Sequence, residues 1–269
     1  MRSSIEVIHA QIVNWRLIIR ISRFERKANY ASYKIGRFWE ILNPCIQVAI
    51  YYLIFGVAMN KGTVSEHNIP YILWLLAGII PWFYISSNIT QGANSIYSQL
   101  SIISKTNMPT AIIPTVVLVN NMPNFIIMGS LLLLFSFLSH YLLYIQFYWL
   151  VYYTIAMIIF VFSLNILTST ITIIFKDFKL MLNSAMRLLI FVSGVIVQFN
   201  LSNDRLLYKI LQLNPIMFLI KGFRFGMFGI GQASIKEVNH LYFWNFVLII
   251  YSIGAFIHTR YRYKYNNYI

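Results

Sequence analysis

Arginine and lysine are the side chains of this sequence whose types and spacing best predict a definite chemistry. They are dense just before an uncharged apolar run at residues 41–59, where the basic residues are Arg23, Arg26, Lys27, Lys34 and Arg37. Such groups bind phosphate through charge-assisted hydrogen bonds, and arginine often makes two at once. Because the apolar run is long enough to cross a bilayer, we expect these residues to lie at the level of anionic lipid head groups. The alternative is that the basic stretch only fixes the orientation of the chain in the membrane.

The composition is that of an integral membrane protein. Of the 269 residues, 59% are hydrophobic and 10% are charged, whereas soluble domains average about 25% charged residues. A net charge of +14 would suggest a nucleic-acid partner in a soluble protein. Here the basic residues flank apolar runs, so membrane lipids are the expected partner and nucleic acid is not.

The apolar runs predict an all-α membrane protein with six transmembrane helices in a single domain. The expected spans are 41–59, 69–89, 110–138, 147–174, 186–199 and 241–258. A cytoplasmic segment at 1–40 precedes them, spans one to five fill 41–199, an external region covers 200–240, and the last span with its basic tail covers 241–269. Lysine and arginine are more frequent in the segments that this layout places inside the cell, so both termini are expected to be cytoplasmic.

Two segments outside the spans predict further helices. Residues 5–27 carry apolar stripes at helical spacing with a basic row between them, which predicts one amphipathic helix in the membrane interface. The external region holds apolar stretches at 206–213 and 216–230 that are too short or too rich in glycine to span. They favour re-entrant helices, with an ordinary loop lying on the outer membrane surface as the alternative.

The sequence lacks the patterns of a catalytic chain. It contains no phosphate-binding GxxxxGK[ST] loop, no HExxH or CxxC motif and no serine nucleophile elbow, and its five histidines are scattered singly. We therefore expect no enzyme, no metal site and no cofactor on this chain. The expected spans contain almost no ionisable groups, which disfavours a secondary transporter driven by protons or ions and favours an energy source on a partner.

Aromatic side chains are abundant, and those near span ends fit the interfacial belt. Tyrosine and tryptophan offer an apolar face with a hydrogen-bonding edge, so deeper rings can line a path for a sugar-like polymer. The candidates for such a path are Trp39, Tyr51, Tyr52, Phe55, Trp82, Phe83 and Tyr84. For any single deep ring, ordinary helix packing is the competing interpretation.

Several motifs, taken in order, resemble those of polysaccharide-exporting type-2 ABC transporter permeases. They are YKIGRFWEILNP at 33–44, SKTNMP at 104–109 with Ile113 and Pro114, FKD at 175–177, and LNP at 213–215 followed by Arg224. Within that family, HNIPYILWLLAG at 67–78 and GAFIHTRYR at 254–262 are most similar to the wall teichoic acid permeases of Gram-positive bacteria. One departure is Gly194 after Ser193, where the family often has proline.

The resemblance implies a homodimer that works with two ATPase subunits, which would bind ATP and magnesium. It also implies an undecaprenyl-diphosphate-linked polymer as cargo and a place in the bacterial cytoplasmic membrane. The expected function is export of wall teichoic acid, and the alternative is export of an O-antigen or capsule polymer. On this basis the five basic residues named first are expected to include those that recognise the cargo diphosphate.

Two further roles follow from the resemblance. Residues 91–105 are expected to form a short helix parallel to the membrane that docks on the ATPase, together with the loop at 175–179. The coupling residues would be Ile96, Leu100, Lys105, Lys176 and Asp177. Gly222, Arg224 and Gly226 would shape the outer exit of the path.

Overall fold

A computed structural model describes residues 2–58, 63–64, 69–100, 108–196, 211–229 and 240–262. The described part is almost entirely helical, which confirms the all-α prediction, and a small antiparallel pair of strands joins β1 (Thr63–Val64) to β2 (Ile69–Pro70). Four helical stretches in it are long and apolar enough to cross a membrane: Tyr71–Ser98, Thr110–Leu138, Phe147–Ile174 and His240–Tyr261. The protein is therefore a multi-pass membrane protein.

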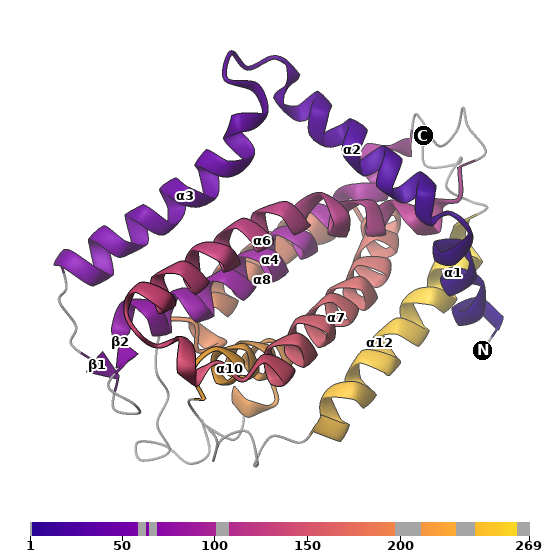
Figure 1. The fold of residues 1–269 in the computed structure, drawn as a ribbon. Coiled ribbons are helices and arrows are strands. Elements are labelled where there is room, and N and C mark those ends of the chain that lie inside the picture. Colours follow the sequence, from indigo (N-terminus) through magenta and orange to yellow (C-terminus); the bar gives the residue numbers. More distant parts are fainter. Residues whose placement is uncertain are drawn as a thin grey trace.

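Helix α4 (Tyr71–Ser98) is the centre of the bundle (Figure 1). It packs against α6 (Ile113–Leu138), which continues the short 3₁₀ turn η3 (Thr110–Ile112), and against α7 (Phe147–Ile174). Every residue from Leu73 to Trp82 is buried, because this part of α4 is apolar on all sides and is covered all round. On its far side α7 packs against α12 (His240–Tyr261), and a 3₁₀ turn, η4 (Leu142–Tyr144), joins α6 to α7.

Helix α10 (Pro215–Phe228) is buried at the end of the bundle where α4 and α7 begin (Figure 1). The Asn214 side chain caps its start by accepting a hydrogen bond from the Ile216 N–H at 3.0 Å, and Pro215 occupies the first turn. Gly229 ends it in the left-handed conformation, with φ +67°. With 14 residues, α10 is about 21 Å long and cannot cross a bilayer. The stretch at 216–230 is therefore a short helix, as expected, and its re-entrant placement in the membrane stays a prediction. Most of the stretch at 206–213 lies outside the described residues.

The amino-terminal helix predicted over 5–27 is two helices, α1 (Arg2–Val13) and α2 (Trp15–Ala31). The break falls at Asn14, whose amide donates to the Ala10 carbonyl at 2.9 Å and so competes with the backbone for that acceptor. Helix α1 lies along α12, where the Tyr251 hydroxyl donates to the Ser4 carbonyl at 2.7 Å and Arg262 pairs with Glu6. Helix α2 instead crosses α6, with Ile18 buried against it.

Helix α3 (Trp39–Tyr51) follows the 3₁₀ turn η1 (Gly36–Phe38) and continues into the π-helical turn η2 (Tyr52–Ala58). These residues form the first predicted span. The helix diverges from the bundle in Figure 1, and much of its apolar surface is exposed, as at Ile46 and Leu53. Within a single chain, α3 packs mainly on α6 and leaves much of its apolar surface uncovered.

The fifth predicted span, 186–199, has wrong boundaries. Helix α8 runs over Phe178–Val192 and ends where Gly194 adopts φ +68°. A basic side chain beside an apolar run predicts the limit of a span, but Lys179 and Arg187 both belong to this helix and line a polar pocket. Residues 197–199 lie outside the described part.

Candidate functional site

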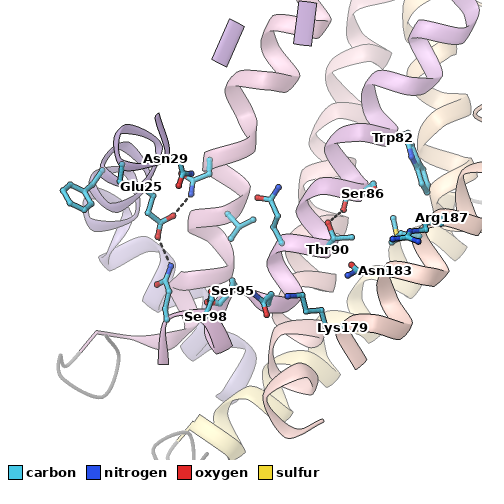
Figure 2. A pocket seen from close by; sticks show the side chains of 18 of the residues that line it. Glu25, Asn29, Trp82, Ser86, Thr90, Ser95, Ser98, Lys179, Asn183 and Arg187 are labelled. Atoms are coloured by element: carbon cyan, nitrogen blue, oxygen red, sulfur yellow. Dashed lines mark hydrogen bonds between the residues drawn. The ribbon is translucent and has the colours of Figure 1, made fainter. Parts of the chain in front are cut away.

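A pocket of about 930 Å³ lies between helices α2, α4, α6 and α8 (Figure 2). Most of its polar lining comes from uncharged side chains, with a basic edge on α8 and one carboxylate on α2. The polar lining residues are Glu25, Asn29, Ser86, Thr90, Gln91, Asn94, Ser95, Ser98, Gln99, Asn120, Lys179, Asn183 and Arg187. This concentration of polar groups around an open volume makes the pocket the candidate functional site.

Helix α4 contributes a row of polar side chains to one wall. Ser86, Thr90, Asn94 and Ser98 recur every four residues, so they share one face. The Thr90 hydroxyl donates to the Ser86 carbonyl at 2.8 Å, and the Ser98 hydroxyl donates to the Ser95 carbonyl at 3.0 Å. These bonds use the hydroxyl protons, so the oxygens remain as hydrogen-bond acceptors toward the pocket.

Helix α2 contributes the acidic edge. The two carboxylate oxygens of Glu25 accept hydrogen bonds from Gln99 Nε2 at 2.7 Å and from Asn120 Nδ2 at 2.6 Å (Figure 2). Charge-assisted bonds of this kind are stronger than neutral ones. One side chain thus holds α2 against the end of α4 and the middle of α6.

A second, smaller pocket of about 230 Å³ lies on the neighbouring face of α4, between α3 and α6. It shares Ser86 and Thr90 with the large pocket. Asn121 on α6 donates to Asn88 Oδ1 at 3.2 Å beside it. The polar surface therefore continues from one face of α4 to the next.

The basic residues predicted to bind phosphate do not line either pocket. Arg23 and Lys27 are exposed on faces of α2 other than the one that carries Glu25, and Lys34 is exposed in the turn that follows. Arg26 is half-buried, and its Nε atom has no hydrogen-bond partner among the described residues. Arg37 lies in η1, and its side chain is outside the described part.

Three of the predicted path aromatics do reach the pockets. Trp82 lines the large one, and Phe83 and Tyr84 line the small one. Of the others, Tyr51 is half-buried, and its ring centroid lies 5.8 Å from that of Phe83.

Tyr52 stacks on Phe135 with ring centroids 6.2 Å apart. Trp39 is half-buried at the start of α3, and the Phe55 side chain is outside the described part.

The predicted coupling segment is not a separate helix over most of its length. Residues 91–98 are the last turns of α4. Gly92 and Ser95 in this segment are buried, so it does not form an exposed loop. Ile96 and Leu100 are buried against Ile113 and Ile173.

The other predicted coupling residues lie nearby. Lys176 and Asp177 are exposed between α7 and α8, and the Lys176 ammonium lies 5.1 Å from the ring centroid of Tyr97. Lys105 is outside the described residues.

The residues predicted to shape the outer exit are packed inside the chain. Arg224 is only 5% exposed, and it donates to the carbonyls of Trp74, Gly194 and Val195 at 3.1, 2.7 and 2.6 Å. Gly222 lies against the Tyr153 ring and Gly226 against the backbone of Leu150. A buried guanidinium needs hydrogen-bond acceptors, and the end of α8 supplies them.

The polar row on α4 and the pocket role of Arg187 are not among the predictions from the sequence, which place Lys179 in the ATPase-facing loop at 175–179. The serine, threonine and asparagine side chains of this row are neither ionisable groups nor part of a known motif. Their four-residue spacing inside a helix long enough to cross the membrane was the available signal.

Four helices long and apolar enough to cross a membrane, with a polar pocket beside one of them, define the class as a multi-pass membrane protein. The sequence matches the family described as ABC-2 type transporter over residues 16–228, and the chain belongs to that family. This confirms the resemblance at the level of the family.

Among its relatives are two O-antigen export system permease proteins RfbA of Klebsiella pneumoniae. They are 24% and 25% identical over 249 residues, which cover 92% of this chain and 93% of theirs. The O-antigen export system permease protein RfbA of Myxococcus xanthus is 26% identical over 214 residues, 77% of this chain and 78% of that protein.

Proposed function

We propose that this chain is the permease subunit of an ATP-driven exporter that moves a lipid-linked polysaccharide across the bacterial cytoplasmic membrane. Family membership and the O-antigen export permeases among the relatives support export of a polysaccharide. The observation that carries the proposal is the polar pocket beside α4, because its hydroxyl and amide groups suit a cargo rich in hydroxyls. The aromatic side chains of Trp82, Phe83 and Tyr84 add faces on which sugar rings can slide.

The energy would come from two ATPase subunits. The four helical stretches that can cross the membrane contain no aspartate or glutamate, so His240 and His258, near the two ends of α12, are their only side chains of the kinds that relay protons. The exposed pair Lys176 and Asp177 is the accessible part of the proposed ATPase contact, with Lys105 beyond the described residues. Ile96 and Leu100 would not touch the ATPase themselves; they would support the contact by packing the end of α4 against α6 and α7.

A second copy of the chain would complete the path. Helix α3 exposes Ile46 and Ile50, and the turn η2 that continues it exposes Leu53. Lipid or a second copy can cover such a surface, and a homodimer would place the small pocket near the dimer interface, because α3 forms one of its walls. In this arrangement both chain termini are cytoplasmic.

Two cargoes are in competition. The local motifs resemble those of wall teichoic acid permeases, whereas the relatives named above are O-antigen permeases. Two strains distinguish them, one lacking its teichoic acid permease and the other lacking its O-antigen permease.

Each strain is given this chain together with its partner ATPase. Surface polymer should return in one strain and not in the other. If neither strain recovers, although the protein is inserted and bound to the ATPase, export of these two polymers is excluded.

A further inference from the structure

Helix α8 turns a basic face toward the large pocket. Lys179, Asn183 and Arg187 follow one another at intervals of four residues and all three line it (Figure 2). Since an α-helix rises about 1.5 Å per residue, the two cations are about 12 Å apart along the axis, with the Asn183 amide between them. Both side chains are long and flexible, so their charged ends can converge on one anion.

Neither cation is neutralised by its surroundings. Among the described residues, the side chains of Lys179 and Arg187 have no hydrogen-bond or ion-pair partner. The salt bridge in the described part of the chain joins Arg262 to Glu6, neither of which lines the pocket. The carboxylate that lines the same pocket, Glu25, is held by Gln99 and Asn120 on the opposite side (Figure 2). Two unpaired cations at the rim of a membrane pocket favour an anionic ligand.

The pocket is also polarised from one side to the other. The α8 edge is positive, the α2 edge carries the Glu25 carboxylate, and the hydroxyl row that includes Ser86 and Thr90 lies between them. A phosphate would be attracted to α8 and repelled near Glu25. Hydroxyl groups attached to that phosphate would then meet the acceptors on α4.

We infer that Lys179 and Arg187, with Asn183 between them, form the site for the phosphate end of the cargo, and that the first sugars extend from there along α4 toward Glu25. The identity of the ligand as a lipid-linked diphosphate rests on the proposed function, whereas the anion site rests on the geometry of the pocket. Phosphate recognition then lies on α8 within the bundle rather than on the basic residues of α2 and of the segment that follows it.

The test is direct binding to the full-length permease in nanodiscs of neutral lipid. The probes are a long-chain polyprenyl diphosphate, a phosphatidylglycerol and inorganic pyrophosphate. The double variant Lys179→Gln/Arg187→Gln should bind the polyprenyl diphosphate about 100-fold more weakly than the unmodified protein, since a hydrogen bond to a charged group contributes about tenfold. The swapped variant Lys179→Arg/Arg187→Lys keeps both charges and should bind within about threefold of it.

The matched control is Arg16→Gln/Arg20→Gln, which removes the same charge from exposed positions on α2 that line neither pocket. It should bind like the unmodified protein. An unfolding temperature equal to that of the unmodified protein shows that each variant is folded.

Unchanged binding by the folded Gln double variant would overturn the inference. An equal loss for phosphatidylglycerol would also overturn it, because the site would then be a general anionic surface. Pyrophosphate binding as tight as that of the polyprenyl diphosphate would overturn the assignment to a lipid.

A failure of the proposed function has a different signature. In that case the unmodified protein exports no polysaccharide in cells, while the binding difference between the variants persists.

Discussion

The guanidinium carbon of Arg224 lies 3.5 Å from the centroid of the Trp74 ring, so a cation on α10 is stacked on the face of an aromatic residue of α4. The same guanidinium donates hydrogen bonds to the carbonyls of Gly194 and Val195 just past the end of α8. One side chain therefore joins a buried short helix to the central helix and to the helix that carries the basic pocket face. Gly78 leaves room for it, because a β-carbon there would lie 2.1 Å from Arg224 Nη2.

Replacement of Arg224 by methionine should destabilise the protein strongly. It leaves the three carbonyls of Trp74, Gly194 and Val195 without a donor, at a cost of about 1–3 kcal/mol for each group that stays unpaired. The unfolding temperature of the purified protein, followed by tryptophan fluorescence, should fall clearly. Arg20→Met, at an exposed position on α2, is the control and should leave it unchanged. An Arg224→Met protein as stable as the control would show that the three bonds are not needed.

Gly222→Ala should destabilise the contact between α10 and α7. A β-carbon at Gly222 would lie 2.1 Å from two ring carbons of Tyr153, which is buried, and overpacking of this kind costs about 1–3 kcal/mol. The matched control is Gly129→Ala on α6, where nothing lies within 4 Å and alanine should be neutral or stabilising. Thermal unfolding of both variants measures the difference, and equal unfolding temperatures would contradict the close packing of α10 on α7.

Glu25→Gln should loosen α2 from the bundle. Glutamine offers one oxygen where the carboxylate offers two, so either Gln99 or Asn120 loses its acceptor and the remaining bond is no longer charge-assisted. Amide hydrogen exchange in α2 should become faster, while exchange in α7 should not change. Glu40→Gln, at the start of α3, removes the same charge elsewhere. If exchange in α2 is the same in both variants, Glu25 does not hold the helix.

Thr90→Val should slow export without unfolding the protein. Valine keeps the shape of threonine but removes the hydroxyl oxygen that faces the large pocket, and one lost hydrogen bond corresponds to about a three- to tenfold effect. Thr168→Val on α7 is the matched control, since its hydroxyl also donates to the carbonyl four residues earlier but lines neither pocket. Export rates are compared at equal amounts of inserted protein. Equal export rates for the two variants would contradict the proposal that α4 lines the path of the cargo.

The long apolar helices were predictable from the sequence, and the polar site was not. The helices over 110–138 and 147–174 have the predicted bounds, because long stretches without charge, flanked by prolines or loops, determine where such helices end. The expected span at 186–199 differs from α8, because a charged side chain beside an apolar run predicts the limit of a span. Lys179 instead belongs to α8 and lines the polar pocket.

The wrong expectation for residues 91–98 has a related cause. A polar segment predicts a surface loop when its neighbours in the fold are unknown. In the structure Gly92 lies against Asn165 of α7, so the segment is in the interior of the bundle. The exit role expected for Arg224 rests on its place in the external stretch at 216–230, and the structure buries it instead. Its three carbonyl partners are spread over α4 and the end of α8, and such long-range contacts leave no local pattern in the sequence.

The central claim is that this chain supplies the path and that a separate ATPase supplies the energy. The most direct test is transport of a radiolabelled lipid-linked polysaccharide in proteoliposomes that contain this permease, with and without its partner ATPase. The account predicts transport only when the permease, the ATPase and ATP are all present. Transport by the permease alone, at the same rate with and without ATP, would contradict it.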